Sequence, residues 1–504
     1  MTFKSKSHIE LPGVPGDPSC AVPRSYVDSL AQGRKLTLQT HPWYHKITLP
    51  TEFASRIDVP GDIKVWGRTR DSLTYALQWD VSQLPEYSPD TPTIYIAPYI
   101  GDPGGYVPGN KGLTPQTPVR TITDAMTKVN ALPGENARLV VITIPGEDRI
   151  YATDLQSLSN VVTSEKNLFV TSMGDDPVFS DGSYSNLSWS PTEETNVWQM
   201  SAPSSTVISR RENAVSDLRK TFGPIGMDYT LKAGLADVAN TPGSFFLDEA
   251  NERLYVRTRD DASPVGQTWL RVNRPSYAWR INPGGKRLTY NNMYFRQRAE
   301  ALQSSTTSAS TNTDHVICNN CTFDAFHSSA HAVTFASTRK CWLLNCTAFN
   351  AMQSGFSYRA GEQNSPMQVI EYNCRSYDNG FSLAQENRSS TTAGNGITIL
   401  RINSQGLNRT YGSTLADIDV GTYACNIGCH MEVPQTAPNS FAYSCGGSKF
   451  WLLDCTTDVP ASDRVLYVHN NVISGVLAGC NFETFSPSGA GDRLFTQNID
   501  NYIA

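Results

Sequence analysis

Five polar residues between positions 331 and 386 are of the types that cleave bonds between sugars: Glu362, Glu386, Asp378, Arg359 and His331. If the apolar runs at 332, 355 and 380 occupy equivalent places in successive turns of a repeat, these side chains converge beside one corner. Two carboxylates on adjacent turns then lie roughly 5 to 8 Å apart, as in enzymes that hydrolyse glycosidic bonds. One carboxyl, kept protonated by its like-charged neighbour, is the predicted acid. The competing interpretation is that Glu362 and Glu386 are solvated loop residues.

A second polar group lies further along the chain, with Asp417 and Asp419 in LADIDV and His430 and Glu432 in GCHMEV. Alternation points both aspartates to one face, opposite Ile418 and Val420 but with Leu415 as an exception. We predict that these aspartates are solvated and available to a substrate. Ca²⁺ is a weaker alternative because no loop with EF-hand spacing surrounds them. The sequence thus predicts no metal and no cofactor.

His331, together with His327 in FHSSAHA, permits a different reaction. A histidine could remove a proton in β-elimination from a uronic acid while Arg359 neutralises the carboxylate of the sugar. A lyase therefore stays open as the alternative to a hydrolase.

Aromatic rings in polar surroundings can stack on the faces of sugars. Tyr377 and Tyr411 meet this description near the predicted corner. With Arg388, Asp417 and Asp419 they form the predicted substrate-binding set.

The elements that position these residues follow from a repeat. The motif NCT occurs at Asn320 and Asn345, and related matches begin at 292, 373, 403, 428, 454 and 479. The intervals from 292 onward are 28, 25, 28, 30, 25, 26 and 25 residues. Each contains three short runs separated by Gly, Asn and Ser, which predicts one coil of a parallel β-helix. N-glycosylation, the other interpretation of NCT, does not predict this spacing.

Six of the eleven cysteines occupy one equivalent position of this repeat, at 321, 346, 374, 429, 455 and 480. Asn tolerates the left-handed backbone of a tight corner, and its amide can bond to the same group one coil away, about 4.8 Å. Cys packs as a small buried hydrophobe. We therefore predict a ladder of corner amides beside a column of reduced thiols, as expected for a chain made in a reducing cytoplasm.

Composition narrows the class of protein. Charged residues make up 17% of the chain, and it contains 36 Gly and 30 Pro, which is typical of a turn-rich all-β protein. A net charge of -6 argues against a nucleic-acid partner. No apolar run reaches the 18 or so residues of a membrane span, so we expect no membrane partner either.

The chain divides into five predicted parts. They are a Pro/Gly-rich linker (1–40), a small β-rich module (41–92), the start of the β-helix with a capping helix (93–183), an insertion (184–268) and the main β-helix (269–504). Thr121 and Asp124 form a capping box for the helix. The insertion ends in a predicted hairpin around Glu249 to Glu252. The expected fold is therefore all-β, a right-handed single-stranded parallel β-helix, with handedness following the rule for parallel crossovers.

Two segments carry a resemblance to a known family. Asp17, Pro18, Ala21 and the run SYVD at 25–28 resemble a linker common in tail fibres and tailspikes of bacteriophages. The stretch from TIYIAPYIGDPGG to the helix at 121 resembles the opening of phage β-helix tailspikes and related polysaccharide depolymerases.

The resemblance implies a virion protein, made in the host cytoplasm, that binds and depolymerises a bacterial capsule or O-antigen. It also implies a homotrimer that joins other phage tail proteins through its N-terminus. A non-catalytic adhesin is the third class of function that stays open. The chain ends directly after the last coil, at NIDNYIA, without the C-terminal trimerisation domain that such a trimer leads one to expect.

Overall fold

The structure is a computed structural model. It describes residues 45–66, 73–97, 109, 111–142, 150–152, 162–173, 178–181, 183–184, 188–202, 215–217, 227–265, 270–273, 281–282, 284–296, 315–325, 331–336, 338–351, 353–360, 366–377, 379, 388–393, 396–407, 413–417, 421–432, 441–459, 464–482, 488–489 and 491–503.

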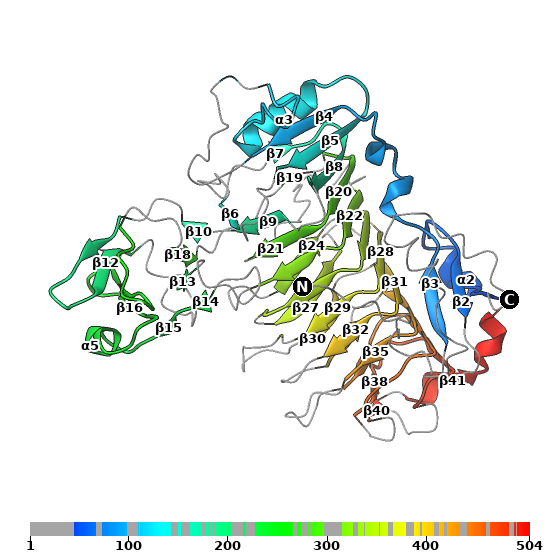
Figure 1. Ribbon diagram of the computed structural model, residues 1–504. Helices are drawn as coiled ribbons and strands as arrows, with labels where there is room; N and C mark the ends of the chain where they lie inside the picture. The colour runs from blue at the N-terminus through cyan, green and yellow to red at the C-terminus, as the bar shows by residue number, and fades with distance from the viewer. Residues whose placement is uncertain are drawn as a thin grey trace, which may run out of the picture.

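Three parallel sheets form the body of the protein, and the chain passes through them in turn (Figure 1). The first sheet has 12 strands: β4 (Thr93–Ile96), β5 (Asn136–Val141), β8 (Asn167–Ser172), β20 (Arg287–Asn291), β22 (His315–Asn319), β25 (Lys340–Leu344), β28 (Met367–Tyr372), β31 (Ile397–Ile402), β34 (Tyr423–Ile427), β37 (Lys449–Leu453), β39 (Ser474–Ala478) and β41 (Leu494–Gln497). The second has eight: β6 (Ile150–Ala152), β9 (Val178–Asp181), β21 (Met293–Arg296), β23 (Thr322–Asp324), β26 (Thr347–Phe349), β29 (Arg375–Tyr377), β32 (Gln405–Leu407) and β35 (His430–Met431). The third has seven: β24 (His331–Ala336), β27 (Ser354–Arg359), β30 (Arg388–Ala393), β33 (Leu415–Asp417), β36 (Tyr443–Cys445), β38 (Leu466–Val468) and β40 (Ser488–Gly489). The predicted parallel β-helix is confirmed.

The corner between the first and second sheets carries the predicted amide ladder. Asn292, Asn320, Asn345, Asn373 and Asn403 all have positive φ, between 52° and 58°. The Asn320 amide donates to Asn292 Oδ1 at 2.9 Å, and the Asn403 amide donates to Asn373 Oδ1 at 3.0 Å. The Asn therefore serves both the backbone turn and the contact between coils, as the repeat predicts.

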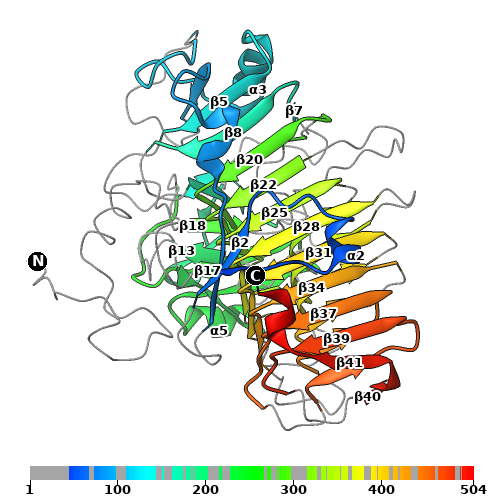
Figure 2. The same ribbon diagram turned by 90° about the vertical axis from the view of Figure 1, so that its right-hand side faces the viewer.

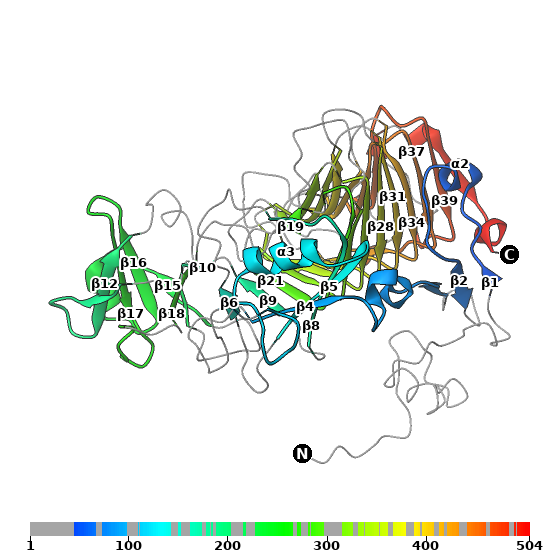
Figure 3. The ribbon, with the colours of Figure 1, turned by 90° about the horizontal axis from the view of Figure 1, so that it is seen from above.

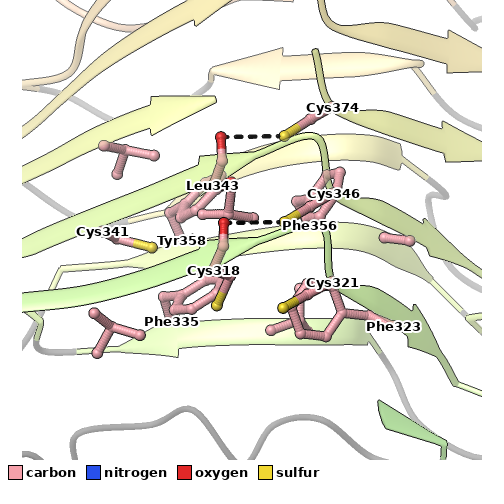
Figure 4. Close-up of a cluster of buried hydrophobic side chains, with 14 of the residues drawn as sticks. Cys318, Cys321, Phe323, Phe335, Cys341, Leu343, Cys346, Phe356, Tyr358 and Cys374 are labelled. Atoms are coloured by element: carbon pink, nitrogen blue, oxygen red, sulfur yellow. Dashed lines mark hydrogen bonds between the residues drawn. The ribbon is translucent and has the colours of Figure 1, made fainter. Parts of the chain in front are cut away.

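The cysteine column lies beside this ladder, inside the helix. All ten described cysteines are free and buried. In the column, each thiol donates to a carbonyl oxygen of the preceding coil, as Cys346 does to Cys318 (3.2 Å) and Cys374 to Leu343 (3.4 Å), shown in Figure 4. Burial raises the pKa of the Cys429 and Cys455 thiols of this column, which keeps them protonated. The predicted column of reduced thiols is confirmed.

A short helix, α3 (Ile122–Ala131), covers the first coil. Thr121 Oγ1 accepts from the Asp124 amide at 3.0 Å, as the capping box predicts. Ile122, Met126 and Val129 of α3 are buried in the apolar core of the β-helix. The apolar end of the stack is thereby shielded from water.

The outer face of the first sheet is apolar and is covered by the chain's own N-terminal module. This module consists of β1 (His45–Lys46), α2 (Thr51–Ala54), β2 (Ile63–Trp66), β3 (Thr74–Leu77) and two 3-10 turns, η4 (Val81–Gln83) and η5 (Pro85–Tyr87). Figure 2 shows it lying across the sheet, next to the C-terminal end. Phe53 meets Trp451 edge to face at 5.8 Å, and Trp79 meets Trp342 at 5.1 Å. The strands of the first sheet from β22 to β37 are buried on both faces, which explains their nearly continuous apolar sequence.

One residue of this module explains a gap in the amide ladder. Tyr75 accepts a bond from the Asn403 amide at its carbonyl (2.6 Å), and its hydroxyl donates to Asp454 Oδ2 (2.9 Å). Between these two ladder positions stands Gly428, with φ of 60°. A Cβ at Gly428 would lie 2.5 Å from Tyr75 Cδ2, so the ring of Tyr75 occupies the space of a side chain. Asn is therefore absent here because the module docks on the ladder.

We expect Gly428→Asn to destabilise the protein although Asn suits the backbone angle. Overpacking against Tyr75 should cost about 1 to 3 kcal/mol in chemical denaturation. In a Tyr75→Ala background the same substitution should cost much less, because the space is then open. Equal costs in both backgrounds would show that Tyr75 does not exclude a side chain at this corner.

The insertion projects from the side of the helix (Figure 3). Five of its strands form one sheet: β11 (Ser190–Pro191), β12 (Val197–Ser201), β15 (Thr230–Leu231), β16 (Ser244–Asp248) and β17 (Arg253–Arg257). The antiparallel pairing of β16 with β17 forms the predicted hairpin. A short helix, α5 (Leu235–Ala239), contacts the hairpin. A second sheet joins β10 (Ser183–Tyr184), β13 (Val215–Asp217), β14 (Met227–Asp228) and β18 (Leu270–Asn273), while β7 (Val162–Thr163) pairs with β19 (Ile281–Asn282). The insertion has an apolar core of its own, separate from that of the β-helix.

Candidate functional site

The outer faces of the three sheets differ in their access to solvent. The N-terminal module covers much of the first sheet. On the third sheet the outward residues Thr334, Ser357 and Ser444 are buried. On the second sheet at least one outward residue is exposed or half-buried in each of six consecutive coils. Among the described residues, the second sheet therefore offers the longest accessible face for a polymer.

A column of polar side chains runs along this face, which we call the outer column. Its members are Thr322, Thr347, Arg375, Gln405, His430 and Thr456, one from each of six successive coils. Arg375 and Gln405 are exposed, and the other four are half-buried. Because coils repeat about every 4.8 Å, the column presents one hydrogen-bonding group per coil.

The sequence contains a signal for this column that the prediction did not use. Each member directly follows the buried Cys or Ser of its repeat, so the Thr of NCT is the outward residue. Arg375 in NCR and His430 in GCH hold the same place. These residues could have been found by extending the motif by one position.

An aromatic pair stands beside the outer column. Tyr377 stacks on Phe349 of the preceding coil, with ring centroids 5.1 Å apart and an interplanar angle of 3°. Tyr377 is half-buried, whereas Phe349 is buried. The structure thus places the predicted substrate-binding Tyr377 on an accessible face, two residues from Arg375. A flat ring supported from behind by a second ring can receive the face of a sugar.

Two carboxylates stand further along the same face. The His430 Nδ1 and Thr456 Oγ1 atoms are 2.9 Å apart, and the two residues are paired on adjacent coils. Glu432 and Asp458 each follow two residues after this pair; Glu432 is half-buried and Asp458 is exposed. The Thr457 hydroxyl donates to Asp458 Oδ1 at 3.1 Å. From the spacing of adjacent coils we expect these two carboxylates to lie roughly 5 to 8 Å apart, the range used in glycoside hydrolysis.

His331 and Arg359 of the predicted corner are brought together by the third sheet. Arg359 Nη2 lies 2.6 Å from His331 Nε2. A guanidinium can only donate, so Nε2 accepts and the imidazole is neutral with its proton on Nδ1. His331 is only 4% exposed. This ring is poorly placed to take a proton from a substrate, because the nitrogen that could accept it is already bonded to Arg359.

The register that paired Glu362 with Glu386 is wrong. The ladder aligns Ser354 of β27 with His331 on one side and with Arg388 on the other. The third strand of that coil is therefore 388–393 rather than a run beginning at Gly380. Glu362 comes three residues after β27 ends, whereas Glu386 comes two residues before β30 begins. The assumption that both carboxylates follow the same end of the third strand no longer holds.

Several predicted residues lie outside the described part of the chain. They are Glu362, Glu386, Asp378, Tyr411 and Asp419, and His327 of the lyase alternative is another. The backbone of Arg388 belongs to β30, opposite Ser354. Their predicted roles stay predictions.

Asp417 does not face the solvent, so this prediction is wrong. Its side chain points into the helix and is 1% exposed. Arg401 donates to both carboxylate oxygens of Asp417, at 2.8 and 3.0 Å, and to Glu371 Oε1 at 3.3 Å. Leu415 lies two residues before Asp417 on β33, so the two side chains point to the same side, and both are buried. The apolar Leu415, treated above as an exception to the alternation, therefore indicated that Asp417 points inward.

The Arg401 ion cluster fills a polar section of the helix interior. Ser390 donates to Glu371 Oε1 at 2.7 Å, and Thr392 donates to Asp417 Oδ1 at 3.2 Å. Arg401 itself is fully buried, and its attraction to Asp417 and Glu371 raises its pKa. The cluster is inaccessible from outside and thus structural.

The described residues contain no group of three or more His, Cys, Asp or Glu side chains arranged to hold a metal ion. None of the helices in this part of the chain has the length and apolar character needed to cross a bilayer.

Comparisons with known proteins find two distant structural similarities. No family model matches the chain, and no curated protein matches it. A solved structure described as a glycoside hydrolase is similar with a TM-score of 0.40 and 9% identity, over 81% of this chain and 95% of the other. The structure of XylC with xylose is similar with a TM-score of 0.36 and 11% identity, over 79% of this chain and 69% of the other. The order of strands in its three parallel sheets makes this chain a parallel β-helix protein.

Proposed function

We propose that the protein is a phage tailspike that binds a bacterial surface polysaccharide, capsule or O-antigen, along the second sheet and hydrolyses it. The observation that carries this proposal is the outer column, which presents one polar group per coil on an accessible face beside the Phe349 and Tyr377 stack. A glycan chain laid along the column meets a new hydrogen-bonding side chain at nearly every sugar. The place in the virion, the homotrimer and the attachment to other tail proteins belong to the same proposal and rest on the linker at 17–28.

Hydrolysis is assigned to Glu432 and Asp458. In such a pair, one carboxyl group protonates the oxygen of the departing sugar. The other carboxylate attacks the anomeric carbon or activates a water molecule. Hydrolysis is preferred to elimination because His331, the candidate base of a lyase, is buried and accepts from Arg359.

A panel of purified capsules and O-antigens tests the function. We expect at least one polymer to bind and to be cut into fragments whose masses include one added water per cleaved bond. Tyr377→Ala should weaken binding about three- to tenfold through loss of stacking. The matched control is Tyr255→Ala, which removes half of another stacked pair, Phe246 and Tyr255, on the insertion.

Other outcomes select other functions. Fragments with an unsaturated end would identify a lyase, and binding without cleavage would identify an adhesin. Loss of binding in Tyr255→Ala but not in Tyr377→Ala would move the site to the insertion. Absence of binding to every polymer would contradict the proposal.

A further inference from the structure

Arg375 is a cation on the proposed binding face, and the described part of the chain gives it no counterion. Its side chain is exposed, and among the described residues it has no hydrogen-bond or ion-pair partner. Its neighbours in the outer column are Thr347 and Gln405, both uncharged. Elsewhere in the described chain, surface lysines form ion pairs, as Lys46 does with Asp62 and the half-buried Lys340 does with Asp58. The guanidinium of Arg375 therefore has its donors free for a ligand.

The surroundings of Arg375 define what such a ligand looks like. Tyr377 follows two residues later on the same strand and the same side of the sheet. A sugar stacked on Tyr377 thus has its edge near Arg375. The planar fork of a guanidinium matches a carboxylate through two parallel hydrogen bonds. Gln405, exposed on the next coil, adds an amide that can both donate to and accept from sugar hydroxyls.

We infer that the polysaccharide is acidic and that Arg375 binds a carboxylate of one of its sugars. This inference rests on the proposed function and adds the class of substrate to it. Arg375 stands two coils from His430, that is about 10 Å along the helix axis. The acidic sugar therefore lies about two sugar units along the polymer from the glycosidic bond that Glu432 and Asp458 cleave. A uronic acid or another sugar with a carboxylate substituent fits this place, whereas a neutral polymer leaves the guanidinium unpaired.

The test compares one polymer in two chemical forms. The first acidic capsule or O-antigen found to bind is used as it is and after reduction of its carboxyl groups to primary alcohols. We expect reduction to weaken binding by the native protein about tenfold, as for loss of a hydrogen bond to a charged group. Arg375→Gln should bind both forms with the same weakened affinity, and its binding should depend less on salt. Arg375→Lys should recover part of the loss, because it keeps the charge but not the fork.

A matched control is Arg253→Gln, which removes an exposed arginine from β17 of the insertion and should leave the tenfold preference unchanged. The inference is overturned if carboxyl reduction weakens the native protein and Arg375→Gln equally, or if the only polymers that bind are neutral. In both of those cases glycan binding itself survives, so the proposed function stands. Failure of every polymer to bind overturns the proposed function and this inference together.

Discussion

Replacing Arg401 by Met is expected to destabilise the protein by about 3 to 5 kcal/mol, which would be the largest effect of any single substitution considered. The substitution leaves the carboxylates of Asp417 and Glu371 buried without their cation. Burying an unpaired charge in a low-dielectric interior costs far more free energy than the packing lost when the side chain becomes smaller. Urea denaturation followed by tyrosine and tryptophan fluorescence measures the change.

Two controls separate charge from packing. Arg339→Met removes an exposed arginine and should change stability by less than about 0.5 kcal/mol. A triple variant, Glu371→Leu with Arg401→Met and Asp417→Leu, removes all three charges and should recover most of the lost stability. If the triple variant is as unstable as Arg401→Met alone, the cost lies in packing or register rather than in unpaired charge.

Glu432→Gln is expected to reduce glycan cleavage by about 10²- to 10⁴-fold while binding persists. The substitution keeps the size and polarity of the side chain but removes the group that transfers a proton or attacks the sugar. Asp458→Asn should have an effect of similar size. The measurement is the release of reducing ends from the polymer identified by binding, at a concentration that saturates the protein.

Glu249→Gln is the matched control, since it makes the same change at an exposed residue of the insertion and should leave the rate unaltered. Full activity in both Glu432→Gln and Asp458→Asn would show that catalysis uses other residues. Parallel loss of binding and cleavage would instead show that these side chains hold the glycan rather than react with it.

The repeat made the fold predictable before any tertiary structure was known. A corner that needs positive φ recurs every 25 to 30 residues. Asn and Cys recur with it because Asn adopts this backbone angle and the following Cys packs inside the coil. The helix cap at Thr121 and the hairpin between β16 and β17 are equally local, and both are present. Such features depend on a few neighbouring residues, so one sequence is enough to show them.

The candidate site was less predictable because it depends on register and direction. Alternation in a strand tells which residues share a face but not which face is inside, so Asp417 was assigned to the wrong side. Loops between sheets differ in length, and the long segment before Arg388 shifted the third strand of its coil by eight or nine positions from the assumed start at Gly380.

The sequence by itself thus determined the coil, its corners and its buried thiols, since these follow from local backbone geometry and from the period of the repeat. Only the tertiary structure decided which outer face is available. Tyr75, Phe53 and Trp79 cover the first sheet although they lie more than 250 residues before their partners in sequence. The sequence of the covered strands does not indicate which segment packs on them. The tertiary structure also brings Arg401 to Asp417 across the interior of the β-helix, and it places Glu432 and Asp458 on adjacent coils. Contacts of this kind are set by the ladder between coils and by packing, because side chains distant in sequence become neighbours only when the strands are in register.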